Sequence, residues 1–587
     1  MIFGQPKRRT ARTASLPSPI GGWNARDSVA NMDPMDAVQM VNWFPTPTDV
    51  TLRKGYTKYS TGITGKVNTL MNYAGVTSQK LFAAADGKIY YADNGPAVQV
   101  FSGLTSDKFQ HVNISTVGGQ FLVACNGVDP VMIYDGSNWA KIATTSTAQT
   151  ISTITHVGAV ATVTTASAHG LVTGNRVVVS GATPTAYNGA YVITVTGTTT
   201  FTYTMASTPA SDATVVGSYT VLGITGVDSS TFINVNLFKN RLYFTQKDTL
   251  KCWYLPVESL GGAASALDFG SIARNGGYLQ AMGTWTLDAG QGADDYAVFV
   301  TNMGEVIVYN GTDPSDATTW ALKGVWQLGQ TFNRRCFFKW SGDLLLLTQD
   351  GLVPLASALQ SSRLDPRVNL TDKIYYAVSQ AATLFSENFG WQINYFASEN
   401  MLIMNIPTNS GNEQFVMHTI TKSWARFTGI EAYCWEVHDV KGMFFGGDGY
   451  VGKFYEGNAD NGVNITASVQ QAYSYFDARG QNKRFTMVRP IFLTTNAPPT
   501  VLCGINVDFQ SQNNLGAVTF NPSTVGVWDT GIWDASSWGD ENYTVNKFWQ
   551  GVTGIGYAGG VVMNIAAQAT DVRWSSTDFV FEDGGVL

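Results

Sequence analysis

A short phrase of two apolar runs joined by a glycine turn recurs along this chain and constrains its fold more than any other feature. In its clearest copy, Met443–Asn458, an apolar run leads into Gly446-Gly447-Asp448-Gly449 and a second apolar run leads out. Asp-Gly between apolar runs predicts a β-hairpin, because the tight turn needs positive φ and glycine adopts it without steric cost. Similar sequences, with turn glycines Gly87, Gly127, Gly304 and Gly351, occupy Leu81–Asn94, Phe121–Gly136, Val298–Gly311 and Leu344–Ser357. A looser copy occupies Phe238–Leu255.

A single hairpin cannot bury its own apolar face, so repeated hairpins predict neighbours stacked around a shared core. The hairpins occupy residues 66–149 and 223–462. At roughly 45 residues per blade, these two stretches predict an all-β chain with a β-propeller of about six or seven blades. A helix is expected only over Ser361–Gln380, with Pro366 breaking it and Asp372–Ala382 as its better half.

Residues 150–222 differ from their surroundings because they are rich in Thr, Val, Ala and Gly and almost free of charge. Alternating segments at Tyr191–Val195 and Phe201–Met205, with a turn signal at Asn188-Gly189, predict a compact β module of about seven strands or fewer. Since the hairpins resume beyond it, we predict a small β-sandwich-like domain inserted into the propeller.

The two ends of the chain lack the hairpin phrase. Residues 1–65 contain many prolines and aromatic residues without periodicity, which predicts an arm lying across another domain or subunit, with one short helix over Pro34–Met40 capped by Asp33. Residues 463–587 predict a second β domain, which we expect to pair with the arm. Six aromatic residues are predicted to lie at an assembly interface: Trp23, Trp43, Phe44, Trp528, Trp533 and Trp538.

The composition limits the classes of function. Charged residues make up 13% of the chain, compared with roughly 25% in average domains, and the net charge of −7 argues against a general attraction to DNA. The five cysteines are far apart, which argues against a disulfide framework and against CxxC metal sites, and fits folding in a reducing cytosol. No apolar run approaches the roughly 20 residues of a membrane helix, so no membrane-spanning segment is expected.

Motifs of catalysis are missing from the sequence. There is no HExxH, GxSxG or CxxC, and Gly62–Lys66 is too short for a phosphate loop. The five scattered histidines are predicted to be structural: His111, His156, His169, His418 and His438. Of these, His418 and His438 could meet in space. A propeller glycosidase would need convergent carboxylates, for which Asp294, Asp295 and Asp439 are candidates, but acids beside turns are usually solvated. We therefore predict a protein that is not an enzyme, with no catalytic residues, metal or cofactor.

Three stretches resemble the tail nozzle proteins of short-tailed bacteriophages, also called tail tubular protein B or head-to-tail stabilisation protein. They are the opening SLPSPIGGWNARDSVANMDPMDAVQMVNWFPTPTDVTLRKGY (15–56), the closing phrase QAYSYFDARGQNKRFTMVRPIF (471–492), and the tryptophan-rich VWDTGIWDASSWG (527–539). The resemblance covers residues 1–149 and 223–587. The insert resembles a β module found in various phage structural proteins.

The resemblance implies a structural virion protein located in the virion tail and assembled in the host cytoplasm. It would form a homohexameric nozzle below the adaptor ring, with a platform β domain built from both chain ends. The nozzle would hold tail fibre, spike or needle proteins and pass double-stranded genomic DNA through its lumen without sequence-specific binding. Low charge and exposed aromatic residues suit such a permanent assembly, because obligate interfaces are large and apolar. The alternative is a glycan-binding or glycan-cleaving β-propeller on a virion or cell surface.

Overall fold

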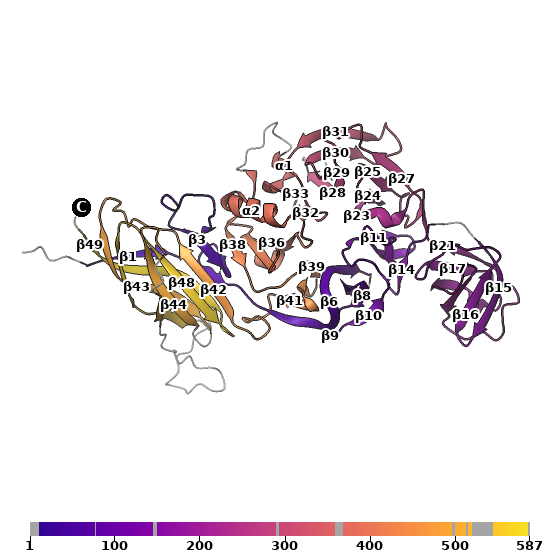
Figure 1. Cartoon of the computed structure of the whole chain (residues 1–587), viewed down its shortest axis with the longest axis horizontal. Helices are drawn as coiled ribbons and strands as arrows, with labels where there is room; N and C mark the ends of the chain where they lie inside the picture. The colour runs from indigo at the N-terminus through magenta and orange to yellow at the C-terminus, as the bar shows by residue number, and fades with distance from the viewer. Residues whose placement is uncertain are drawn as a thin grey trace, which may run out of the picture. The chain divides into compact units, whose positions relative to one another are not determined.

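The computed structural model describes residues 11–76, 78–144, 149–288, 293–358, 368–438, 440–495, 499–511, 515–518 and 544–584 (Figure 1). Strands dominate these residues, and their longest helix is α2 (Tyr375–Phe385). The chain forms two compact units. Unit 1 comprises Met1–Tyr59, Pro366–Gly447 and Val451–Leu587, and unit 2 comprises Ser60–Asp365 and Asp448–Tyr450.

Unit 2 contains five successive groups of three or four antiparallel strands; four of the groups are separate sheets, and the first belongs to an eight-stranded sheet that also contains strands between residues 434 and 454. The first two groups are β6 (Tyr56–Ala74), β7 (Gln79–Ala85), β8 (Lys88–Tyr91) and β10 (Val98–Phe101), and then β11 (Gln110–Thr116), β12 (Gly119–Cys125), β13 (Met132–Tyr134) and β14 (Trp139–Lys141). The third and fourth are β23 (Phe232–Phe238), β24 (Arg241–Gln246), β25 (Lys251–Tyr254) and β27 (Ser265–Asp268), and then β28 (Leu279–Asp288), β29 (Ala293–Thr301), β30 (Glu305–Gly311) and β31 (Trp320–Gln327). The fifth is β32 (Phe337–Trp340), β33 (Asp343–Thr348) and β34 (Gly351–Pro354). Short parallel pairs add β9 (Gly95–Pro96) to β6 and join β22 (Ile224–Thr225) to β26 (Gly262–Ala263), and α1 (Leu355–Ala358) follows β34.

The faces of successive sheets pack on one another. Strand β11 contacts β23, β23 contacts β28, and β28 contacts β32 and β33. A separate apolar cluster lies between each of three neighbouring pairs of sheets, such as the one that joins Val123 of β12 to Phe244 of β24. Sheets stacked in this way are the blades of a β-propeller, so the predicted architecture is confirmed. The count of six or seven blades stays a prediction, since it included strands that belong to unit 1.

The glycine turns behave as their chemistry predicts. All six expected hairpins form, and the turn glycines Gly87, Gly127, Gly304 and Gly351 have φ values from 67° to 114°. A Cβ at Gly304 would lie 2.4 Å from the carbonyl oxygen of Gly329, so only glycine fits this turn without displacing backbone.

The predicted insert forms its own seven-stranded sheet. Its strands are β15 (Gln149–Val157), β16 (Val160–Thr165), β17 (Arg176–Ser180), β18 (Gly189–Val192), β19 (Thr194–Val195), β20 (Thr200–Thr204) and β21 (Ser218–Val221). Strand β15 pairs with both β16 and β21, and the two halves of the sheet enclose a core that includes Phe201 and Tyr219. Both chain crossings lie side by side, because Ala143 and Gly223 form a parallel bridge.

Unit 1 interleaves the two ends of the chain in two large sheets. The first contains β1 (Ala11–Pro17), β4 (Trp43–Pro45), β5 (Val50–Leu52), β43 (Lys483–Thr494), β46 (Thr544–Lys547), β47 (Gln550–Gly556) and β49 (Val572–Asp583). The second contains β2 (Gly22–Trp23), β3 (Asp36–Val41), β35 (Gln392–Phe396), β36 (Met401–Thr408), β37 (Gly411–His418), β38 (Trp424–Phe427), β42 (Ile465–Gln471), β44 (Thr500–Val507), β45 (Gly516–Val518) and β48 (Gly559–Ala567). Figure 1 shows the indigo β1 beside the yellow β49, with which it pairs from residue 11 to residue 17. The expected platform built from both chain ends is therefore confirmed.

Two expectations differ from the structure, and the second expected helix is confirmed in part. The helix expected over Pro34–Met40 is wrong, because Asp36–Val41 is strand β3, whose backbone pairs with β42 more than 400 residues later. The better half of the second expected helical stretch, Asp372–Ala382, is confirmed as helical, because a 3₁₀ turn over Asp372–Ile374 leads into α2, which extends to Phe385. The domain expected over 223–462 is divided between the units, since β35–β38 share a sheet with β3 in unit 1. The last strands of that stretch are β39 (Cys434–His438), β40 (Gly442–Gly446) and β41 (Asp448–Phe454), and β40 and β41 form the last of the expected hairpins.

Candidate functional site

Two of the aromatic residues predicted at an assembly interface belong to the core of unit 1. The side chain of Trp43 is 0% exposed, and its ring centroid lies 6.1 Å from that of Trp574 on β49. Phe44 is 4% exposed and its ring lies 5.5 Å from the ring of His418. Another chain cannot contact side chains buried this deeply, so their assembly role is corrected to a role in the subunit core.

The other predicted interface residues have different outcomes. Trp23 on β2 is half-buried, and its ring meets Phe415 edge-on at 5.1 Å. Trp528, Trp533 and Trp538 lie outside the described residues, so their predicted role stays a prediction.

The weaker catalytic candidates are held by ordinary structural contacts. Gly62–Lys66 lies within strand β6 rather than in a loop. Asp295 accepts a 2.6 Å hydrogen bond from Lys239, which lowers the pKa of the carboxyl and keeps it ionised. His438 is buried on β39 and its Nδ1 accepts from the backbone N–H of Lys441. The side chain of Asp294 and all of Asp439 lie outside the described residues.

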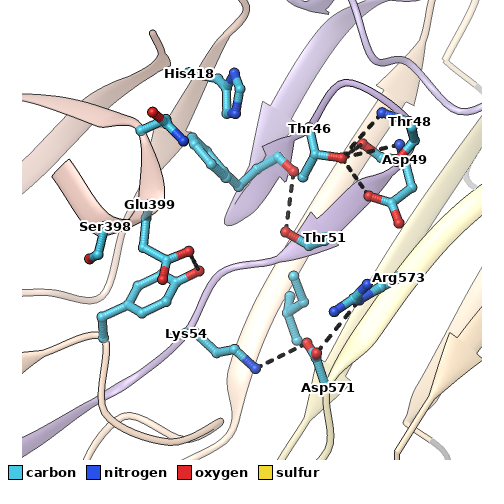
Figure 2. Close-up of a pocket in the computed structure, with 14 residues that line it drawn as sticks. Thr46, Thr48, Asp49, Thr51, Lys54, Ser398, Glu399, His418, Asp571 and Arg573 are labelled. Carbon is cyan, nitrogen blue, oxygen red and sulfur yellow. Dashed lines mark hydrogen bonds and ion pairs between the residues drawn. The ribbon is translucent and has the colours of Figure 1, made fainter. Parts of the chain in front are cut away.

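A polar cavity of about 340 Å³ in unit 1 was not predicted from the sequence. Figure 2 shows its lining, which comes from the β4–β5 turn, the 3₁₀ turn η5 (Ala397–Glu399), the last residues of β37 and the start of β49. Three carboxylates face two cationic side chains and one imidazole: Asp49, Glu399, Asp571, Lys54, Arg573 and His418.

The turn between β4 and β5 fixes one carboxylate. Pro45 and Pro47 hold the backbone extended, and Thr46 then caps the turn. The Thr46 hydroxyl donates to Oδ1 of Asp49 at 2.6 Å and accepts from the Asp49 backbone N–H at 3.2 Å. The second oxygen of Asp49, Oδ2, has no hydrogen bond within the described residues.

The turn η5 supplies the second carboxylate. It ends at Asn400, whose φ of 50° is a left-handed conformation that asparagine tolerates. The Tyr455 hydroxyl donates to Oε2 of Glu399 at 2.8 Å. Burial, and then this hydrogen bond to Glu399, raise the pKa of Tyr455, so its hydroxyl stays protonated as the donor. Oε1 of Glu399 is without a hydrogen bond in the part of the chain that the structure describes.

The third carboxylate is neutralised by its neighbours. Oδ1 of Asp571 lies 3.2 Å from Nζ of Lys54, and Oδ2 lies 3.8 Å from Nε of Arg573 (Figure 2). Lys54 also donates to the side-chain oxygen of Asn458 at 2.9 Å. Both cations are therefore held on this side of the cavity by groups of the protein itself.

His418 borders the cavity from β37 and is 5% exposed. Its Nδ1 accepts from the backbone N–H of Thr421 at 3.3 Å. Burial lowers the pKa of His418, so the ring is neutral at pH 7 and its proton resides on Nε2. Among the described residues no acceptor partners this Nε2–H.

This arrangement has the character of a binding site. Donors and acceptors line one pocket that is open to solvent, while the described residues contain no group of three or more His, Cys, Asp or Glu side chains suited to a metal ion. No local motif could have indicated the cavity, because its lining comes from positions 44 to 573. Among the described residues no helix is long and apolar enough to cross a membrane.

Comparisons with known proteins return only distant structural likenesses. No protein-family model and no curated protein matches the chain. The β-propeller domain of Swd1 from Myceliophteria thermophila has a TM-score of 0.26 at 8% identity, over 66% of this chain and 95% of that chain. Sqt1 from Saccharomyces cerevisiae has a TM-score of 0.26 at 10% identity, over 72% of this chain and 96% of that chain. YCF48 bound to D1 peptide has a TM-score of 0.24 at 10% identity, over 70% and 94%. Because these scores are low, none supports an argument about function.

Proposed function

We propose that this protein is a structural component of a virion tail, a homohexameric nozzle that docks below an adaptor ring and forms a channel for DNA ejection. The observation that carries the proposal is the interleaving of both chain ends in the sheets of unit 1, where β1 pairs with β49 and β3 pairs with β42. A domain whose sheets contain strands from both the first and the last part of the chain is suited to serve as a rigid platform for ring contacts.

The outer surface around β43, β46 and β47 supports this proposal. It exposes four large apolar side chains with exposed fractions from 37% to 68%: Met487, Val545, Phe548 and Ile555. Single exposed apolar side chains are common, so the proposal is that these four, spread along β43, β46 and β47, contribute to a ring contact. The edge strand β1 is also largely exposed, and edge strands with few charges pair readily with other chains.

The proposal includes the partners that the nozzle function requires. The adaptor ring and the tail fibre, spike or needle proteins would bind the assembled hexamer, and genomic double-stranded DNA would pass without sequence-specific contact. A net charge of −7 suits a conduit, because a lumen that repels phosphate does not retain the moving duplex. In this role the protein performs no catalysis, and it acts in the virion tail after assembly in the host cytoplasm.

The test is the oligomeric state of the purified full-length chain. We expect negative-stain images to show rings with a central hole and mass photometry to show six times the chain mass of 63.4 kDa. Ile555→Asp should reduce ring formation, because it places a charge on the apolar surface of unit 1. The matched control is Val157→Asp at the 85% exposed tip of the insert, which should leave rings intact.

A monomeric protein under all conditions would contradict the proposal. If that monomer bound or cleaved polysaccharide through unit 2, the alternative of a glycan-binding or glycan-cleaving propeller would replace it. If both aspartate variants formed rings as well as the unchanged protein does, the contact surface would lie elsewhere in the chain.

A further inference from the structure

We infer that the polar cavity of unit 1 binds a neutral, hydroxyl-rich ligand, one sugar unit of a glycan. This inference goes beyond the nozzle function and does not depend on it, because the cavity lies within a single unit of a single chain. It also differs from the glycan alternative above, which concerned the propeller.

The first argument is an unused donor. His418 lines the cavity and is 5% exposed, its Nδ1 accepts from the backbone N–H of Thr421, and its Nε2–H has no acceptor among the described residues. This nitrogen is not among the fully buried polar atoms that lack a partner, so it is accessible to water or to a ligand oxygen. A ligand oxygen in the cavity would complete this hydrogen bond.

The second argument is a pair of unused acceptors. Thr46 occupies Oδ1 of Asp49 and Tyr455 occupies Oε2 of Glu399, while Asp49 Oδ2 and Glu399 Oε1 have no partner in the described part of the chain. Both carboxylates are fixed by these bonds, so they can accept hydroxyl hydrogens without losing much conformational entropy. A sugar ring carries several hydroxyl groups that donate and accept at once, which matches a mixed set of donors and acceptors.

The charge balance argues against an anionic ligand. The three carboxylates of the lining outnumber its two cations, Lys54 and Arg573, which already pair with Asp571. A phosphate or sulfate would therefore meet net repulsion. A cationic ligand could pair with the unused oxygens of Asp49 and Glu399, so arginine serves as the competing probe in the test.

The size of the cavity sets the size of the ligand. Its volume of about 340 Å³ lies near the lower end of the roughly 300–1,000 Å³ of small-molecule pockets. One sugar unit fits this space, while an oligosaccharide would extend into solvent. Binding through a few hydrogen bonds to one unit predicts a Kd of roughly 1 mM.

The test uses saturation-transfer NMR on the full-length protein. The neutral probes are the methyl glycosides of glucose, mannose, galactose and N-acetylglucosamine, and the charged probes are inorganic phosphate and arginine. We expect at least one glycoside to bind with a millimolar Kd, and both charged probes to bind more weakly. Glu399→Gln should weaken the glycoside about tenfold, because a charged acceptor becomes neutral. Tyr455 can still donate to the new amide oxygen in this variant.

The matched control is Glu387→Gln, an exposed position of unit 1 after α2, which should bind as the unchanged protein does. His418→Phe removes the Nε2 donor and should abolish binding, and a thermal melt of each variant shows whether unit 1 is still folded. If His418→Phe fails to fold, Glu399→Gln on the surface turn still tests the inference.

The inference is overturned if none of the four glycosides binds, if Glu399→Gln binds with unchanged Kd, or if arginine or phosphate binds more tightly than every glycoside. Ring formation, measured on the same samples, separates this result from the proposed function. If the protein forms rings but binds no glycoside, only the cavity inference is contradicted. If it binds a glycoside but forms no rings, only the nozzle proposal is contradicted.

Discussion

Replacing Trp43 by alanine tests whether the N-terminal arm belongs to the core of unit 1. The indole is fully buried against Trp574, with ring centroids 6.1 Å apart. Truncating a buried tryptophan loses its transfer free energy and leaves a cavity, which together cost about 3–5 kcal/mol. We therefore expect Trp43→Ala to lower the free energy of unfolding of unit 1 by about this amount.

Differential scanning calorimetry is the assay, because the chain contains two compact units. A loss of this size in a domain of this length lowers Tm by roughly 6–20 °C. We expect the transition of unit 1 to fall and that of unit 2 to stay in place. The matched control is Trp139→Ala, whose side chain is 2% exposed and packs at 5.2 Å from Phe82 in unit 2, and which should shift only the other transition.

Two results would refute this reasoning. If Trp43→Ala left both transitions in place and abolished ring formation, the side chain would serve assembly, as the sequence alone indicated. If each substitution shifted both transitions equally, the two units would unfold as one, and the assignment of Trp43 to a separate core would fail.

Three further substitutions test other parts of the argument. Gly304→Ala should destabilise unit 2 by about 1–3 kcal/mol in chemical denaturation, because φ is 82° and the new Cβ meets backbone, whereas Gly103→Ala, at φ 78° with open space around it, should cost less. Deleting 144–222 and joining the ends with two glycines should leave a soluble chain with its β circular-dichroism signal, since Ala143 already bridges Gly223. Arg26→Ala should raise the pKa of Asp27 from about 2 toward about 4 in a carbon-13 NMR titration, because the Arg26 hydrogen bond is the main cause of the depression. A depressed carboxyl pKa stabilises the fold above pH of about 4, and this contribution is lost as the pH falls toward about 2.

Local chemistry allowed much of the fold to be predicted. Turns such as Asp448-Gly449 depend on the conformational freedom of single residues, so six hairpins could be placed before any pairing was known. The insert could be delimited because residues 150–222 differ in composition from the chain on both sides. Stacked hairpins then predicted the propeller, because a hairpin needs neighbours to bury its apolar face.

The sequence by itself determined these local elements, while the platform of both chain ends was predicted only through the resemblance to tail nozzle proteins. Only the tertiary structure decided that residues 36–41 form a strand, because pairing with β42 outweighs the local preference for a helix. It also decided that Trp43 packs on Trp574, and that Asp49, Glu399 and His418 share a cavity. These contacts join positions hundreds of residues apart, and a sequence pattern cannot specify them, since they depend on strand order and register across the whole unit.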